Sequence, residues 1–176
     1  MALTAPSFAF PGGRQFEHLD AGAGLGETLT RFSGKTPLFA ELSTTELTQL
    51  AGYLDLYRAR SQDVLVTEGE AGDFMMLVIE GEVDIVKAGL NGMRRRMSTV
   101  GAGMTVGEMS MIDGAPRFAT CIAARLTTFA ILTRAQMRKM MAERPDLACK
   151  ILVRLVSMLA VRLRHTTAQL MQQMGA

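Results

Sequence analysis

Residues 107–120, with the sequence GEMSMIDGAPRFAT, combine a glycine, a carboxylate and an arginine at close spacing. Gly107 allows a tight turn and a close approach of a ligand to the backbone. The run EMSMI after it predicts a short helix whose first N–H groups are free to bind an anion, and Ser110 is too small to obstruct them. Arg117 follows on the next predicted strand, and its planar guanidinium suits two oxygens of one phosphate.

Glu108 lies beside this predicted phosphate site, where a second negative charge needs an explanation. A carboxylate accepts a hydrogen bond from a ribose 2′-OH, so it fits a phosphate whose molecule also carries that hydroxyl. Arg117 is also expected to pair with Glu108 when no ligand is bound. These residues together predict a site for a ribose phosphate with a free 2′-hydroxyl.

The rest of the sequence predicts the elements that must hold this site. The chain has 176 residues, of which 48% are hydrophobic and 20% charged, the balance of one globular domain. Residues 1–25 are rich in Ala, Gly and Pro, so we expect a flexible N-terminal arm. Residues 26–54 are interpreted as N-terminal helices, 55–133 as short strands separated by Gly-containing turns, and 134–176 as two further helices. Such a series of strands favours a sandwich or a small barrel.

Helix boundaries are marked in several places. Ser43 and Glu46 have the S-x-x-E spacing of a capping box. Pro145 ends one helix and suits the first turn of the next, which is expected to continue to about Gln173. This last helix carries a mostly apolar heptad pattern, formed by Leu152, Val156, Leu159, Leu163, Thr166 and Leu170. Because the pattern continues beyond what so small a domain must cover, we expect the helix to pair with a second copy; packing on its own domain is the alternative.

Charge is unevenly distributed along the chain. The net charge is +2, but residues 134–176 hold eight Lys/Arg against two Asp/Glu, or +6, which leaves −4 for residues 1–133. A basic segment can face an anionic partner, although a solvated helix face is the simpler interpretation. The run GMRRRMS at 92–98 is interpreted as a charged edge strand rather than a nucleic-acid contact.

Several functional classes are not supported by the sequence. Cys121 and Cys149 have apolar neighbours and no metal-ligand spacing, so we expect buried reduced thiols and a cytoplasmic protein. His18 and His165 are far apart in the sequence, and we expect no metal and no cofactor. No run reaches about 18 apolar residues and no signal-peptide pattern is present, so we expect no membrane span. No nucleophile with a base is recognisable, so we expect no enzymatic activity.

GEMSMIDGAPRFAT resembles the phosphate-binding cassette of cyclic nucleotide-binding domains, whose pattern is G-E-[apolar]-[A/S]-[apolar], then P-R-x-A-T. The resemblance extends from about Pro37 to Leu170 and includes Gly69 and Gly81 at glycine positions of the family. It implies an α+β fold, an eight-stranded antiparallel β-roll (a jelly-roll-like barrel) flanked by N-terminal helices and a long C-terminal helix. It also implies a cyclic nucleotide as the ligand, with cyclic AMP slightly favoured over cyclic GMP.

The resemblance implies roles for individual residues. Gly107 and Ser110 would offer backbone amides to the cyclic phosphate, Arg117 would bind its exocyclic oxygens, and Glu108 would accept the ribose 2′-OH. Met109, Phe118 and Ala119 would contact the ligand from within the cassette. Met97 and Ser98 would lie on a strand beside the base. On the C-terminal helix, either Arg162 or Thr166 would cap the base.

Phe118 departs from the family pattern, because the residue after the arginine is usually Ala, Ser or Thr. Its ring could crowd the mouth of the pocket, stack on the base, or turn into the core with only its N–H facing the ligand. A ring that blocks the pocket would leave a different protein of the same fold. That protein would be a dimerisation or protein-interaction module that binds no nucleotide.

We therefore expect a cyclic nucleotide sensor that transmits ligand occupancy through its C-terminal helix, either to the second subunit of a homodimer or to an unknown effector protein. No helix-turn-helix pattern follows the long helix, so we expect a receptor domain alone or a part of a longer protein. Without a recognition helix, the +6 segment would give only non-specific DNA binding. Haem or iron–sulfur sensing would need clusters of Cys or His that the sequence lacks.

Overall fold

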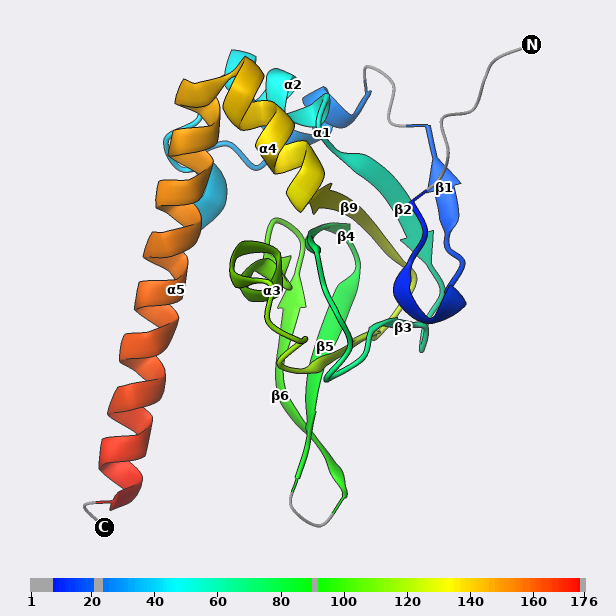
Figure 1. Cartoon of the computed structure of the whole chain (residues 1–176), viewed down its shortest axis with the longest axis vertical. Helices are drawn as coiled ribbons and strands as arrows, with labels where there is room; N and C mark the ends of the chain where they lie inside the picture. The colour runs from blue at the N-terminus through cyan, green and yellow to red at the C-terminus, as the bar shows by residue number, and fades with distance from the viewer. Residues whose placement is uncertain (1–7, 21–23, 90–91, 175–176) are drawn as a thin grey trace.

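The computed structural model describes residues 8–20, 24–89 and 92–174 of the chain. Within these residues, nine strands form two antiparallel sheets that face each other as a β-roll (Figure 1). The first sheet has the order β1 (Glu17–Leu19), β2 (Asp55–Ala59), β9 (Thr127–Thr133), β4 (Phe74–Glu80) and β7 (Thr105–Val106). The second has the order β3 (Val64–Val66), β8 (Thr120–Ala123), β5 (Glu82–Ala88) and β6 (Arg94–Gly101).

The predicted fold is confirmed, with two differences in detail. Strands β2 to β9 supply the eight strands expected between residues 55 and 133, and β1 adds a ninth from the N-terminal segment. The two sheets do not close into a barrel, because β1, β7, β3 and β6 remain as edges. The arginine-rich strand β6 is one of these edges and is largely exposed, as its charge predicts.

The flexible arm predicted for residues 1–25 is wrong for the part that the structure describes. Residues 17–19 form β1, which pairs with β2, and residues 24 and 25 already belong to helix α1. Phe10 is buried at 6% exposure and packs edge-to-face against Tyr57 and other rings. The Gly and Pro content suggested a chain without regular structure, but the aromatic residues between them gain enough burial to hold it on the roll. Residues 1–7 and 21–23 of the predicted arm lie outside the described residues.

Helices cover one end of the roll and extend along one side of it (Figure 1). Ser43 and Glu46 form the predicted capping box, with Glu46 N donating to Ser43 Oγ and Ser43 N donating to the Glu46 carboxylate. A second capping box, between Thr133 and Gln136, was not anticipated. The α-helices are α1 (Gly24–Thr30), α2 (Thr44–Ala51), α3 (Glu108–Asp113), α4 (Arg134–Glu143) and α5 (Pro145–Met174), and the two short 3₁₀ helices are η1 (Pro11–Gly13) and η2 (Pro37–Phe39).

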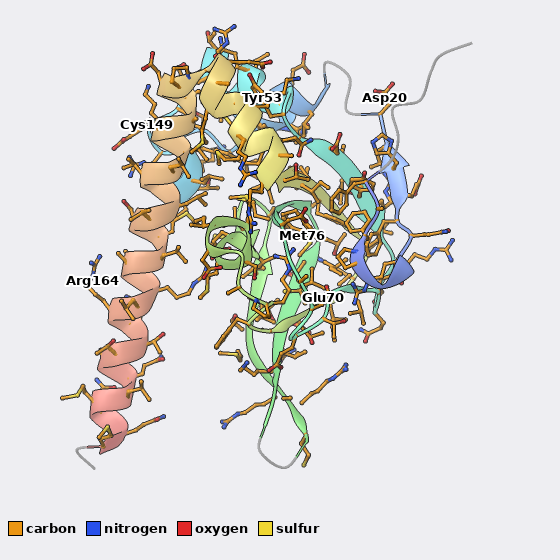
Figure 2. The ribbon with its side chains drawn as sticks, in the orientation of Figure 1. Asp20, Tyr53, Glu70, Met76, Cys149 and Arg164 are labelled. Atoms are coloured by element: carbon orange, nitrogen blue, oxygen red, sulfur yellow. The ribbon has the colours of Figure 1, made fainter. Side chains whose placement is uncertain are left out.

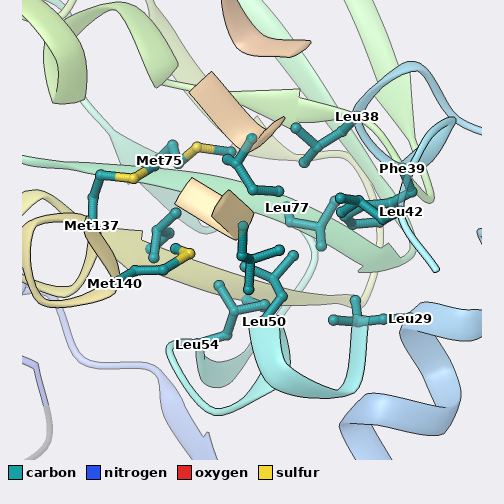
Figure 3. Close-up of a cluster of buried hydrophobic side chains, with 14 of the residues drawn as sticks. Leu29, Leu38, Phe39, Leu42, Leu50, Leu54, Met75, Leu77, Met137 and Met140 are labelled. Atoms are coloured by element: carbon teal, nitrogen blue, oxygen red, sulfur yellow. The ribbon is translucent and has the colours of Figure 1, made fainter. Parts of the chain in front are cut away.

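Strand β4 is shared by two hydrophobic cores, which explains why Phe74, Met75, Met76, Leu77 and Val78 are all buried. Alternate side chains of a strand point to opposite faces of its sheet. One set fills the space between the two sheets, and the other set contacts the helices. The core between the sheet and the helices is drawn in Figure 3, where side chains from α2, α4 and β4 interdigitate.

Helix α5 is packed at its start and exposed along its second half. Its buried residues are Leu147, Ala148, Ile151 and Leu155, all within its first eleven positions. From Val161 onward every described residue of the helix is exposed. Figure 2 shows Arg164 pointing from α5 away from the roll.

Cys121 is buried, and burial raises the pKa of its thiol to about 12, so it is an unreactive core residue. Cys149 is exposed on α5, which corrects the prediction that both cysteines are buried; it is followed by Lys150, and the buried face of the helix here carries Leu147, Ala148 and Ile151 instead. The described residues include no group of three His, Cys, Asp or Glu side chains placed to bind a metal, and no helix with the length and apolar character to cross a membrane.

An ion pair between Glu46 and Lys150, 2.7 Å apart, joins α2 to α5. Its hydrogen bond to Lys150 is the main cause that lowers the Glu46 pKa from 4.5 to about 2. A lowered carboxyl pKa stabilises the fold above the unfolded-state value and loses that effect as pH falls from 4.5 to about 2. We expect Glu46→Gln to lower the free energy of unfolding at pH 7 by under about 1 kcal/mol, because exposed pairs are screened.

The measurement is a comparison of thermal unfolding of Glu46→Gln and the wild type between pH 7 and pH 2. Glutamine keeps the capping box, so the comparison isolates the charge. The two melting temperatures should converge as the pH approaches 2. The control is Glu80→Gln, which removes an exposed carboxylate elsewhere on the roll and should change the melting temperature at pH 7 little. A difference that persists unchanged at pH 2 would contradict the assignment.

Candidate functional site

Gly107 begins the candidate site at the end of β7. Its φ of 79° is in the left-handed region that favours glycine, and it is the N-cap of α3. A Cβ at this position would lie 2.5 Å from Arg117 Nη1, so the close approach of the arginine also requires glycine. Helix α3 ends at Gly114 with φ 76°. The first amides of such a helix have no intrahelical acceptor, and Arg117 reaches this end of α3 by donating from Nη1 to Gly107 O.

Arg117 is held in a buried position with part of its guanidinium unpaired. The side chain is 3% exposed, Nη1 donates to Gly107 O at 2.9 Å, and the guanidinium carbon lies 4.3 Å from the centre of the Phe74 ring. Nε and Nη2 have no hydrogen-bond partner among the described residues. Burial lowers the pKa of the guanidinium, against the opposing effect of nearby carboxylates that include Glu70. The charged form is therefore short of partners, and an anion at Nε and Nη2 would supply them.

Glu108 is buried at 1% exposure and is bound by the C-terminal helix. Its Oε1 accepts a hydrogen bond from Arg162 Nη1 at 2.6 Å, and its Oε2 has no partner in the described part of the chain. The sequence predicted that Arg117 would pair with Glu108 in the free protein, and this is wrong. Arg117 instead donates to the backbone carbonyl of Gly107. The Glu108 carboxylate pairs with Arg162, which lies 54 positions further along the chain.

The structure also adds a supporting residue that sequence reasoning missed. Arg134, at the start of α4, donates from Nε to Met111 O at 2.8 Å and from Nη2 to Ser110 O at 2.7 Å. Both carbonyls lie in the C-terminal part of the six-residue α3, where Ser110 O also accepts a hydrogen bond from Gly114 N at 3.0 Å. A cation there also complements the helix dipole. Its position after β9 gave no signal in the sequence, because only the tertiary fold brings it to α3.

Phe118 does not turn into the core, which overturns one of the three predicted positions of its ring. The side chain is 54% exposed. Lys87 Nζ lies 4.1 Å from the ring centre and donates to Phe118 O at 2.5 Å and to Glu68 Oε1 at 2.7 Å. The ring is therefore held at the surface by a cation–π contact. Arg117 itself lies in the segment before β8 (Thr120–Ala123), so the prediction that it is on a strand is wrong.

The remaining predicted site residues lie at the surface or within the cassette. Ser110 and Ala119 are buried, at 3% and 8% exposure, whereas Met109 is 42% exposed. Met97 and Ser98 are exposed on β6, and the structure describes no hydrogen bond from either to the buried cluster. Thr166 is exposed on α5 and donates to Arg162 O at 3.0 Å. The structure thus brings together Gly107, Ser110, Arg117 and Arg162 around Glu108 and leaves the expected base contacts open to solvent.

Two surface depressions lie elsewhere on the molecule. One of about 390 Å³ is lined by the N-terminal segment and Tyr57, and another of about 250 Å³ lies near Gly81 and Arg125. Neither contains a buried polar atom without a partner among the described residues. The unpaired atoms of Arg117 and Glu108 identify a ligand site better than these volumes do, because a buried unsatisfied group is costly unless a ligand completes it.

Comparisons with known proteins agree with this geometry. The family described as "Cyclic nucleotide-binding domain" matches residues 57–144, which is half of the chain. A crystal structure of a cyclic nucleotide-binding domain from Methylobacillus flagellatus is similar over 89% of this chain and 88% of that one, with 36% identity and a TM-score of 0.79. The catabolite activator protein of Thermus thermophilus is similar over 77% of this chain and 62% of that one, with 27% identity and a TM-score of 0.71.

A cAMP-dependent protein kinase regulatory subunit from Yarrowia lipolytica is 33% identical over 92 residues, which are 52% of this chain and 24% of that protein. The chain therefore spans about a quarter of the length of this relative. The matched family, the fold and the cassette together establish that this chain belongs to the cyclic nucleotide-binding domain family.

Proposed function

We propose that this protein is a cyclic nucleotide sensor that binds one cyclic AMP or cyclic GMP per chain, with cyclic AMP favoured slightly. One observation carries the proposal. Arg117 Nε and Nη2 are buried donors without partners, and Glu108 Oε2 is a buried acceptor without one, all within the described residues. A ribose 3′,5′-cyclic phosphate offers a phosphate anion to the first and a 2′-OH donor to the second.

The ion pair between Glu108 and Arg162 supports a route by which ligand occupancy would reach the C-terminal helix. Arg162 is bonded to the carboxylate that would receive the ligand's hydroxyl, and its side chain is 47% exposed at the mouth of the site. The helix around it is otherwise exposed, so this ion pair is its described link to the roll beyond Val161. A ligand that changes the strength of this ion pair would shift the equilibrium between two positions of the helix. The size of the shift equals the difference in the ligand's binding free energy between the two positions.

Isothermal titration with cyclic AMP and then cyclic GMP tests the proposal directly. Saturable binding of one nucleotide per chain is the expected result, and adenosine should bind more weakly because it offers Arg117 no anion. Absence of both heat and a thermal shift with either nucleotide would contradict it. That result would favour the alternative, an interaction module whose pocket is obstructed by Phe118.

We further propose that the exposed second half of α5 forms a homodimer. Along the predicted heptad pattern, Val156, Leu163 and Leu170 are 60%, 67% and 53% exposed, an apolar surface that a second copy of the helix would cover. We expect the wild type to sediment as a dimer and Leu163→Glu to weaken association by at least about 10-fold, because it would bury a charge. Val161, which is 47% exposed but off the pattern, is the matched control. Val161→Glu should remain dimeric, and a monomeric wild type would contradict the proposal.

A further inference from the structure

Arg14 joins the N-terminal segment to the loop between β3 and β4. Arg14 Nη1 lies 2.8 Å from Glu70 Oε2 and 3.1 Å from Glu70 Oε1, and it also donates to Pro11 O at 2.7 Å. Its Nη2 contacts Thr67 Oγ1. The Arg14 and Glu70 side chains are only 18% and 17% exposed, so this pair is sheltered more than a surface ion pair. Figure 2 labels Glu70 on the roll.

The same loop holds the backbone of Arg117 on both sides. Arg117 N donates to Glu70 O, and Gly69 N donates to Arg117 O, each at 2.8 Å. The Glu70 carboxylate closes the loop by accepting a hydrogen bond from Thr67 N at 2.9 Å. Gly72 lies so close to the guanidinium that a Cβ there would overlap Arg117 Nε. The shape of this loop therefore sets the position of the arginine.

A second connection runs through aromatic rings. The fully buried Phe74 has the Arg117 guanidinium over its ring, 4.3 Å from the centre. The ring also makes edge-to-face contacts with Phe8, at 5.0 Å between centres, and with Phe10, at 5.6 Å. Both phenylalanines belong to the N-terminal segment. The segment thus supports the backbone of Arg117 through Glu70 and its guanidinium through Phe74.

We propose that residues 8–16 are a positioning element for the anion-binding site, with Arg14 acting through Glu70, and Phe10 through Phe74, on Arg117. The inference rests on the proposed function, since Arg117 is taken as the phosphate ligand. Neither Arg14 nor Phe10 is part of the cassette. Thermodynamic linkage makes the effect reciprocal: release of the segment weakens anion binding, and the bound anion holds the segment more firmly on the roll.

The test compares Arg14→Ala with Arg58→Ala in the full chain. Arg58 lies 3.5 Å from Glu17 and also fastens the N-terminal segment, through β1 and β2, but away from the loop that holds Arg117. We expect Arg14→Ala to weaken cyclic AMP binding by about 10-fold. Arg58→Ala should change it less than about 2-fold, because an exposed pair contributes little. Arg14→Lys, which keeps the charge opposite Glu70, should recover part of the loss.

A second readout needs no ligand. The Nε–H resonance of Arg117, identified by its disappearance in Arg117→Lys, should be sharp in the wild type and in Arg58→Ala and broadened or shifted in Arg14→Ala. Wild-type affinity together with an unchanged resonance in Arg14→Ala would overturn the proposal. So would equal losses of affinity in Arg14→Ala and Arg58→Ala, which would indicate general destabilisation.

The two readouts also separate this inference from the proposed function. If the wild type binds no cyclic nucleotide, the proposed function fails, and the Arg117 resonance alone decides whether the segment positions the arginine. If Arg14→Ala does not fold, Phe10→Leu serves as the second variant, because it loosens the contact with Phe74 while keeping an apolar side chain in the core. It should weaken cyclic AMP binding and perturb the Arg117 resonance in the same direction.

Discussion

Replacing Arg117 with alanine is expected to weaken cyclic AMP binding by about 30-fold or more while leaving the fold intact. The guanidinium offers Nε and Nη2, both buried and unpaired, to a charged phosphate. Loss of one partner of a buried, hydrogen-bonded charge pair costs about 2–5 kcal/mol, and each 1.4 kcal/mol is about tenfold in affinity. Titration calorimetry of the variant and the wild type measures the effect.

The stability of the ligand-free variant gives an independent check. In the free protein the Arg117 guanidinium is desolvated, which lowers its pKa, and it has fewer hydrogen bonds than donors. Removing the side chain leaves a cavity, which destabilises the fold, but it also removes the free-energy cost of burying unpaired donors. The two effects oppose each other, so we expect little change in melting temperature. Stabilisation by the ligand, in contrast, should be lost. This arrangement is typical of a binding site, in which the free protein holds a charge that only the ligand satisfies.

Two control variants define the cause. Arg117→Lys keeps the charge but not the planar pair of donors, so its affinity should lie between those of the wild type and Arg117→Ala. Arg125→Ala removes an exposed arginine that is not part of the cassette and pairs with Glu82 at 3.1 Å. This variant should bind cyclic AMP as tightly as the wild type does. Unchanged cyclic AMP affinity in Arg117→Ala would contradict the site assignment.

The part of this site that the sequence predicts is the part whose residues are close together in the chain. Gly107, Glu108 and Arg117 span eleven positions, and the requirements of a tight turn, a carboxylate and a fork of donors are visible in their types. The strands and the Ser43 capping box are likewise local patterns. Such features depend on neighbours in sequence, which is why the series of helices and strands could be predicted, whereas the β-roll itself was implied by the resemblance to a known family.

The features that the sequence did not predict depend on distant contacts. Arg162 reaches Glu108 from 54 positions away, and Arg14 reaches Glu70 from 56. Local composition even suggested the opposite for the N-terminal segment, since its Gly and Pro residues are typical of a flexible chain. The burial of Phe10 against Phe74 outweighs that tendency, and it becomes visible only once the sheet is assembled. The outward position of Phe118 likewise depends on Lys87, from a different strand.

Glu108 is expected to make binding depend on the 2′-hydroxyl of the ribose. We expect the wild type to bind cyclic AMP about 5- to 150-fold more tightly than 2′-deoxy cyclic AMP. The reason is that Glu108 Oε2 is a buried acceptor, and a ligand without the hydroxyl leaves it unsatisfied. The cost of an unsatisfied buried group is about 1–3 kcal/mol. Glu108→Ala removes the acceptor, so this variant should bind both nucleotides weakly and with nearly equal affinity.

Arg162→Ala is the matched variant that separates ligand binding from transmission. It removes the partner of Oε1 but leaves Oε2 available to the ligand. It should therefore keep the preference for the 2′-hydroxyl that Glu108→Ala loses. The two variants should behave alike in the second half of α5, where either one removes the 2.6 Å ion pair that joins the helix to the roll. Faster amide hydrogen exchange beyond Val161 in both variants would report that common loss.

Binding of the two nucleotides to the two variants tests whether the two oxygens of the Glu108 carboxylate have different roles. If Oε2 binds the ribose hydroxyl and Oε1 holds the helix, Glu108→Ala loses both the preference for cyclic AMP over its 2′-deoxy analogue and the protection of α5 amides from hydrogen exchange. Arg162→Ala loses only the protection of the amides. Equal binding of cyclic AMP and its 2′-deoxy analogue by the wild type would contradict the role of Oε2. Unchanged exchange in Arg162→Ala would contradict the role of Oε1. Because Glu108 is almost fully buried, water cannot replace either partner, and under this proposal the carboxylate would be the point at which ligand and helix meet.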